Sequence, residues 1–157
     1  MPENLTILER RRIEALIVKP IYQVLTRDFG LETANKIISE AIENDAQEAG
    51  RREAALEEGP TDLATFKAIL PNWSRGGALD IEVIEATSQS LCYDVTRCQY
   101  ATMYKEMGML DLGFLLSCGR DGAYMKGYAP EVEMIRTQTI MTGSSRCDFR
   151  YQLKKSK

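Results

Sequence analysis

The sequence of 157 residues contains no histidine. This absence excludes Ser-His-Asp and Cys-His catalysis, catalytic zinc held by histidine, and the side chain that most often moves protons near neutral pH. Any acid–base step must use aspartate, glutamate, tyrosine, lysine, cysteine or a bound water. This is the strongest limit that the composition sets on a mechanism.

The sequence also lacks paired cysteine motifs, long apolar segments and concentrated positive charge. Its four cysteines form no CxxC pair, so we expect free thiols in a reducing compartment. No stretch approaches the roughly 20 apolar residues that span a bilayer, and the start MPENLTILERRR has no signal core. With a net charge of -3, the basic runs at 10–12 and 154–155 are interpreted as solvated surface. We therefore expect a cytoplasmic protein that binds neither nucleic acid nor membrane.

The first half of the chain has the periodicity of helices, and its length fits one domain over residues 1–157. A first helix should be interrupted near Pro20 and end at Gly30. A second should start near Glu32, and its later part, residues 43–58, is polar enough to face solvent or a partner. The apolar stripe predicted to pack the first helix on the core consists of Ile13, Leu16, Ile17, Ile21, Val24 and Leu25.

The next segment combines a short helix with a predicted loop. Thr61 or Asp62 can cap the helix at its N-terminus, and the loop at 71–80 contains the single tryptophan. Trp73 either anchors this loop or covers a pocket.

The second half changes to β-branched and aromatic patterns. It predicts a hairpin with strands at 81–86 and 90–97, helices at 98–108 and 111–126, and strands at 131–141 and 147–153. Helices followed by a mostly antiparallel sheet with a helical insertion make an α+β domain.

Cys147 and Asp148 stand side by side at the start of the last predicted strand. Strand alternation places them on opposite faces, so they can act as an acid–base pair on one substrate only if a bulge re-aims one of them. Cys147 is either a buried core residue or part of a site, as a nucleophile or a ligand.

Two other cysteines lie at element ends. Cys98 precedes a predicted helix, where backbone N–H groups and the neighbouring Arg97 favour a thiolate, although a purely structural role fits equally well. Cys118 follows the apolar run FLLS and is a buried core residue or a site residue. Three separated thiols can also hold a soft metal or an iron–sulfur cluster, although their spacing matches no compact ligand motif.

Arg136 lies in a predicted strand that is otherwise apolar or hydroxyl-bearing. A guanidinium in such a position needs an anion. The internal candidates are Asp94, Asp121 and Asp148, and the external candidate is the carboxylate of a bound ligand.

The motifs VTRCQYATMYKEMGMLDLG, CGRDGAYMKGYAP, RTQTIMTG and RCDFRY, in this order, resemble the L-2-amino-thiazoline-4-carboxylic acid hydrolase family. The N-terminal RRRIEALIVKPIYQVL is similar to that family too, so the resemblance covers nearly the whole chain. It implies hydrolytic opening of a cyclic isothiourea that bears a carboxylate, with a carbamoyl-cysteine product. The motifs also resemble vinyl-reductase-like (4VR) ligand-binding domains, whose helices pack on an antiparallel sheet.

The family pattern is intact in this sequence and implies a set of site residues. The implied roles are covalent attack by Cys98, Cys118 or Cys147, general acid or base action by Asp121 or Asp148, and substrate binding by Arg97, Arg136 and Thr139.

Three functions follow as hypotheses. The first is a cytosolic hydrolase that needs no cofactor and acts on a small carboxylated substrate. The second is a sensor that binds a small molecule, a metal or a cluster in the same pocket without catalysis. The third is an interaction domain that forms a homodimer through residues 43–58.

Overall fold

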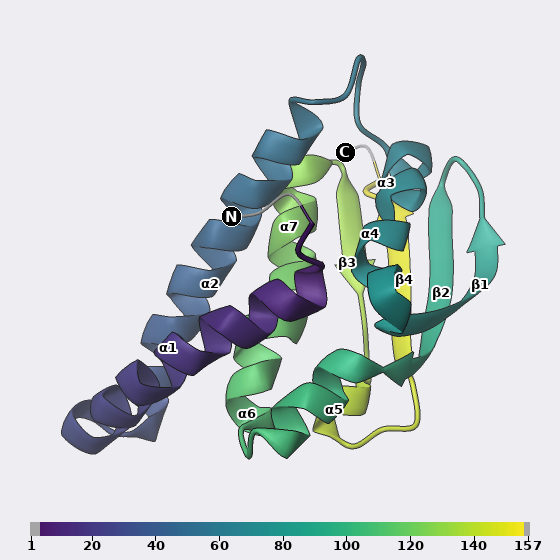
Figure 1. The fold of residues 1–157 in the computed structure, drawn as a ribbon. Helices are drawn as coiled ribbons and strands as arrows, with labels where there is room; N and C mark the ends of the chain where they lie inside the picture. Colours follow the sequence, from purple (N-terminus) through teal and green to yellow (C-terminus); the bar gives the residue numbers. More distant parts are fainter. Residues whose placement is uncertain (1–3, 156–157) are drawn as a thin grey trace.

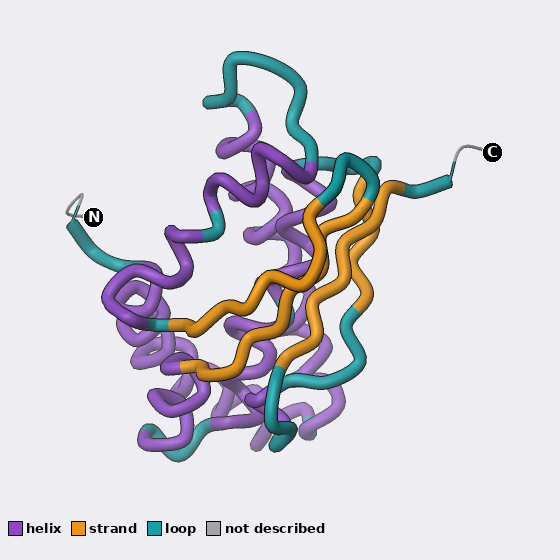
Figure 2. The backbone as a smooth tube through the Cα atoms, turned by 90° about the vertical axis from the view of Figure 1, so that its right-hand side faces the viewer, coloured by secondary structure: helices purple, strands orange, loops and turns teal. Residues whose placement is uncertain are grey.

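The computed structural model describes residues 4–155 and shows helices packed against a four-stranded antiparallel sheet (Figure 1). The α+β fold predicted from the sequence is confirmed. The strand order is β1-β2-β4-β3, and Figure 2 shows the strands side by side in front of the helices. The strands are β1 (Leu79–Ala86), β2 (Ser90–Cys98), β3 (Val132–Ile135) and β4 (Cys147–Leu153).

Two long helices and several short ones make up the rest of the fold. No helix within residues 4–155 is long and apolar enough to cross a membrane. The helical elements are α1 (Ile7–Phe29), α2 (Leu31–Ala54), α3 (Leu63–Ile69), α4 (Pro71–Ser74), η1 (Arg75–Gly77), α5 (Gln99–Glu106), α6 (Leu110–Gly113), η2 (Phe114–Cys118), α7 (Arg120–Tyr128) and η3 (Ile140–Thr142).

The first helix begins at a capping box and ends at a glycine. Thr6 accepts a hydrogen bond from the Glu9 N–H, and the Glu9 carboxylate accepts one from the Thr6 N–H in return. The predicted interruption near Pro20 is absent, because α1 continues through this exposed residue and loses only the hydrogen bond that proline cannot donate. Gly30 ends the helix as predicted, with a φ of 86°.

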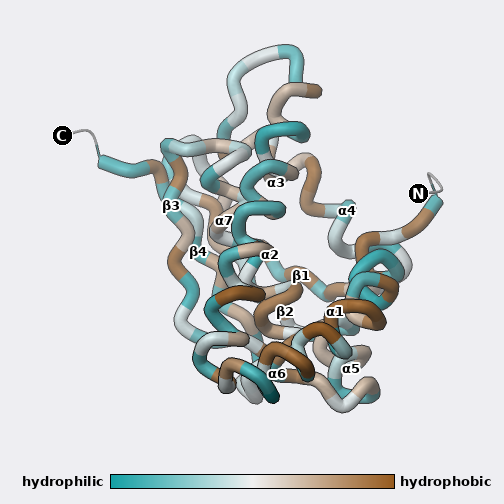
Figure 3. Tube along the Cα trace, turned by 90° about the vertical axis from the view of Figure 1, so that its left-hand side faces the viewer, coloured by the Kyte–Doolittle hydropathy of each residue, from teal (hydrophilic) through white to brown (hydrophobic). Residues whose placement is uncertain are grey.

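The prediction that the apolar stripe of α1 packs on the core was wrong for most of its members. Ala15 is fully buried, and Val18, Tyr22 and Leu25 are partly buried against the core formed with α5 and α6. Apolar residues therefore occupy more than one face of α1, which periodicity alone did not resolve (Figure 3). The exposed members of the predicted stripe are Ile13, Leu16, Ile17, Ile21 and Val24.

The hairpin of β1 and β2 confirms the prediction for residues 81–97, and β4 matches the last predicted strand. β3 is shorter than predicted and ends at Ile135. Beyond it, the backbone N–H groups of Thr137 and Gln138 donate to the Asp148 carboxylate, at 2.8 and 2.9 Å, instead of to a strand. The predicted helix at 111–126 is divided into α6, η2 and α7, and the predicted loop at 71–80 contains α4 and η1.

Helices α2 and α7 pack with their backbones in close contact. A Cβ atom added to Gly50 would lie 2.2 Å from the Tyr124 carbonyl oxygen, and one added to Gly127 would lie 1.9 Å from that of Gln47. Only glycine therefore fits at either position. The segment 43–58, predicted to face solvent or a partner, is exposed at most positions, and its buried residues Ala46 and Gly50 lie on the side of α2 that packs on α7.

Candidate functional site

A cavity of about 710 Å³ is lined by the sheet and by α1, α2, α4, α5, η2, α7 and η3. It is large enough for a small organic ligand, and such cavities are the usual binding sites of small molecules. The residues of its lining that carry a charge or a thiol are Arg10, Arg11, Arg52, Glu53, Cys98, Cys118, Arg120, Asp121, Arg136 and Cys147.

Five of the eight predicted site residues line this cavity. They come from the end of β2, the end of η2, the start of α7, the segment after β3 and the start of β4, so the fold brings five separate places of the sequence together. These residues are Cys98, Cys118, Asp121, Arg136 and Cys147.

Cys147 lies on the inner face of the sheet, opposite Val95 of β2. It is buried, and its Sγ accepts a hydrogen bond from the Ile140 N–H at 3.2 Å. Asp148 points to the other face and is held by Thr137 and Gln138. Alternation along β4 thus separates the two side chains as predicted, and Asp148 shapes a loop outside the cavity.

Cys98 is the N-cap of α5, and its Sγ accepts a hydrogen bond from the Ala101 N–H at 3.4 Å. Burial raises the pKa of Cys98 to about 11, and this N–H group opposes the rise only in part. The thiol is therefore protonated at neutral pH. Arg97 does not line the cavity, because it binds both carboxylate oxygens of Asp80 at 2.8 Å on the exposed side of the hairpin.

Burial also raises the pKa of Cys118 and of Cys147. Cys118 closes η2, a turn of π-helix, which is a form common at functional sites. The cavity therefore presents three neutral thiols at neutral pH.

Arg136 and Asp121 form an ion pair at 2.6 Å in the cavity wall. Of the two alternatives left open for the anion that Arg136 needs, the structure shows the internal carboxylate, and it is that of Asp121. The second terminal nitrogen of Arg136 donates to the Cys118 carbonyl at 3.1 Å, and the guanidinium lies 5.2 Å from the centre of the Phe149 ring. Burial raises the pKa of Asp121, although Arg136 opposes this.

Thr139 is buried but does not line the cavity. Its hydroxyl oxygen accepts a hydrogen bond from the Thr142 N–H at 3.2 Å and caps η3. Together with Arg97 and Asp148, it is one of the three predicted site residues that the fold places elsewhere. No group of three or more cysteine, aspartate and glutamate side chains within residues 4–155 is arranged to hold a metal ion.

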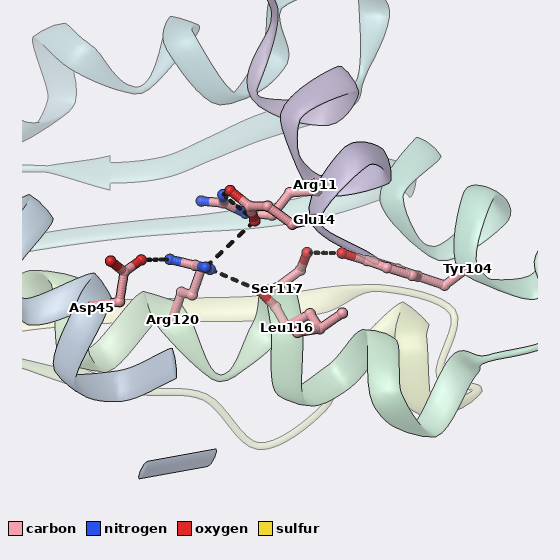
Figure 4. A network of polar contacts seen from close by, with 7 residues as sticks. All are labelled: Arg11, Glu14, Asp45, Tyr104, Leu116, Ser117 and Arg120. Carbon is pink, nitrogen blue, oxygen red and sulfur yellow. Dashed lines mark hydrogen bonds and ion pairs between the residues drawn. The ribbon is translucent and has the colours of Figure 1, made fainter. Parts of the chain in front are cut away.

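The N-terminal helices α1 and α2 contribute to the site, which was not predicted from the sequence. Arg11, interpreted as solvated, has only 13% of its side chain exposed and forms a polar network with Glu14 and Arg120 (Figure 4). Arg11 lies four residues before the fully buried Ala15, on the same face of α1, but the sequence alone does not indicate which face is buried. Trp73 both lines the cavity and packs against Phe66 and Tyr124, so it combines the two predicted roles.

Comparisons with known proteins agree with this architecture. The model of the family described as L-2-amino-thiazoline-4-carboxylic acid hydrolase matches residues 10–151. Among solved structures, the phenol-responsive sensory domain of the transcription activator PoxR, crystallised with phenol, has a TM-score of 0.58 and 9% sequence identity, over 94% of this chain and 76% of that one. At this identity the likeness shows a common fold. A search of curated proteins found no match.

Proposed function

The chain belongs to the L-2-amino-thiazoline-4-carboxylic acid hydrolase family, and from that premise we propose that its cavity binds a small carboxylated cyclic isothiourea and opens the ring by hydrolysis. One observation carries the proposal, namely that three cysteines, Asp121 and Arg136 converge on a single cavity. The four cysteines are free thiols, which supports a reducing compartment such as the cytoplasm.

Ring opening needs one water molecule and two proton movements. The water oxygen adds to the ring carbon between nitrogen and sulfur, and either the C–S or the C–N bond then breaks. One proton of the water passes to the ring nitrogen as the C=N double bond becomes single. The second passes from the added hydroxyl to the atom that leaves, either the sulfur or the same nitrogen, so a C=O bond forms and the product is a carbamoyl-cysteine. A general base that accepts a proton from the water and returns it to the leaving atom serves both stages.

Asp121 is the residue best suited to move this proton. It lies in the cavity wall, and burial raises the pKa of its carboxyl group, which makes it a better proton acceptor than an ordinary aspartate. Arg136 holds the carboxylate in place. The thiols have raised pKa values, so we propose water as the attacking group and the cysteines as the neutral wall beside it.

Turnover of L-2-amino-thiazoline-4-carboxylate, followed by mass spectrometry, tests the proposal. The wild type should form a carbamoyl-cysteine, Asp121→Asn should not, and Cys147→Ser should keep most of the activity. A wild type that forms no product would reject the hydrolase.

A second candidate function is ligand sensing without catalysis. One observation favours it, namely that the fold matches that of a phenol-responsive sensory domain. A substrate that raises the melting temperature of the protein but yields no product would support this function over hydrolysis.

A further inference from the structure

The cavity wall contributed by α1 contains a guanidinium that is only partly paired. Nη1 of Arg11 donates to both carboxylate oxygens of Glu14, at 3.1 and 3.0 Å. Within residues 4–155, neither Nε nor Nη2 of Arg11 makes a hydrogen bond, and neither is a fully enclosed atom. One edge of this guanidinium is thus available to a molecule in the cavity.

Glu14 is shared between two arginines. Its Oε2 atom also lies 3.5 Å from Nη2 of Arg120 (Figure 4). Arg120 is otherwise committed, because its Nε donates to the Leu116 carbonyl at 2.8 Å and its Nη1 to Asp45 at 2.9 Å. Two largely buried cations therefore depend mainly on one carboxylate whose side chain is 27% exposed, since the Asp45 side chain is 61% exposed.

The remaining charges of the cavity add to this excess. Five arginines line it against two acidic residues, Glu53 and Asp121, and Asp121 is already paired with Arg136. Burial, and then the positive charge of Arg120, lower the pKa of Arg11. A bound anion would offset the repulsion from Arg120 and stabilise the charged form of Arg11.

Arg136 is poorly placed to receive a ligand's carboxylate. Its two terminal nitrogens already donate to Asp121 and to the Cys118 carbonyl, and aromatic rings lie beside its face. A bidentate pair with a ligand would require one of these contacts to break.

We propose that Arg11 is the anchor of the ligand's carboxylate, and that it binds through Nε and Nη2 while Glu14 holds the guanidinium in place. The nature of the ligand in this proposal rests on the proposed function. The ligand's carboxylate is assigned to Arg11 on α1 instead of to Arg136 beside the sheet. The reacting ring then extends from α1 toward Asp121 and the thiols.

The test measures binding of a carboxylate that cannot be hydrolysed by this reaction. The probes are L-thiazolidine-4-carboxylate, in which the carbon between nitrogen and sulfur is a saturated CH2 group, and its carboxamide, with affinities from isothermal titration calorimetry. Arg11→Gln should weaken binding of the carboxylate by roughly 10- to 100-fold, the range for charge-assisted hydrogen bonds, and leave the carboxamide unchanged. Arg12→Gln, an equal loss of charge at an exposed position outside the lining, should change neither.

Two further variants separate binding from folding. Arg11→Lys keeps the positive charge next to Glu14 but loses the two parallel N–H donors of the guanidinium. This variant should therefore fold and still bind the carboxylate more weakly. Glu14→Gln removes the shared negative charge, while the glutamine amide oxygen can still accept from Nη1 of Arg11, so this variant should bind the carboxylate more tightly. A merely structural role for this network predicts no tightening.

Each outcome decides between the proposals. Three outcomes would overturn the proposal that Arg11 is the anchor. They are an equal change in affinity for Arg11→Gln and Arg12→Gln, an equal loss of affinity for the carboxylate and the carboxamide, and no binding of the carboxylate to the wild type. Hydrolysis of L-2-amino-thiazoline-4-carboxylate with an unchanged KM in Arg11→Gln would keep the hydrolase and reject the anchor. Binding that depends on Arg11 in a wild type without turnover would keep the anchor and reject the hydrolase.

Discussion

Two aspartates predicted as catalytic differ in what they contact. Asp121 faces the cavity and pairs with Arg136, whereas Asp148 binds backbone N–H groups of a loop. Asp121→Asn should abolish turnover and reduce the free energy of unfolding by about 1–3 kcal/mol, because Arg136 loses a buried partner. Turnover assays and denaturant unfolding measure the two effects.

The matched control is Asp148→Asn. It should lose about 1–2 kcal/mol of stability through its weakened loop contacts and keep its turnover. Equal losses of activity in the two variants would show that exposure to the cavity does not decide which carboxyl group acts.

The raised pKa of Cys98 makes stability depend on alkaline pH. Its ordinary pKa is about 9 and its value in the fold is about 11. The folded state holds the proton more tightly than the unfolded state, so this stabilisation is complete below pH 9 and is lost as pH rises toward 11. Between pH 8 and pH 10 the wild type should lose about 1 kcal/mol more than Cys98→Ser, as measured by urea unfolding.

Tyrosines with a raised pKa also destabilise the fold at high pH. Their effect on the free energy of unfolding is present in both the wild type and Cys98→Ser, so it cancels in the comparison. An identical pH dependence of wild type and Cys98→Ser would mean that this thiol ionises as readily in the fold as outside it.

Five of the eight predicted site residues line the cavity and three do not. Local features of the chain explain which residues belong to each group. Strand alternation separated Cys147 from Asp148, and the need of a strand arginine for an anion pointed to a partner for Arg136. Arg97 was assigned from the resemblance, but β2 is irregular opposite Asp80 and Ile81, and Arg97 pairs with Asp80 on the exposed side. The position of Arg97 next to Cys98 in the sequence does not indicate that its side chain lies on the exposed side.

Among the elements, the closest backbone contacts are those between α2 and α7. Gly127→Ala would place Cβ 1.9 Å from the Gln47 carbonyl oxygen, so the helices must separate and the cavity wall on α2 must move. We expect a loss of about 3 kcal/mol, at the upper end of the range for overpacking, and weaker ligand binding. Thermal or denaturant unfolding measures the change.

Gly59→Ala is the control for this substitution, because nothing lies within 4 Å of a Cβ atom there and the glycine does not have a positive φ. It should change stability by less than about 0.5 kcal/mol. A Gly127→Ala variant as stable as Gly59→Ala would contradict the close packing of α2 on α7.

The existence of most elements could be predicted, but their orientation could not. The hairpin and β4 followed from β-branched and aromatic patterns, and Asp62 capped α3 as one of two candidates. On α1, however, apolar residues surround the helix, and only tertiary packing selects Ala15 and Arg11 for the inner side. The division of 111–126 at the π-turn has no periodic signal of its own.

At the scale of the whole molecule, the order of helices and strands was enough to predict the α+β fold. The cavity was not predictable in the same way, because its walls combine residues 7–11 of α1, the second half of α2 and the inner face of the sheet. No local pattern specifies how these elements are placed relative to one another. The family resemblance identified the thiol side of the cavity but not the arginines of α1.

The central claim, that this cavity is where the ligand binds, can be tested on the cysteines themselves. Cys98, Cys118 and Cys147 line the cavity, whereas Cys92 lies on the other face of the sheet near Glu85 and serves as an internal control. Modification of each thiol by methyl methanethiosulfonate would be followed by peptide mass spectrometry, with and without L-thiazolidine-4-carboxylate at ten times its Kd. The structure predicts that the three cavity thiols react about 10-fold more slowly with the ligand while Cys92 is unchanged. Unchanged rates at all three in the presence of bound ligand, or equal protection of Cys92, would contradict it.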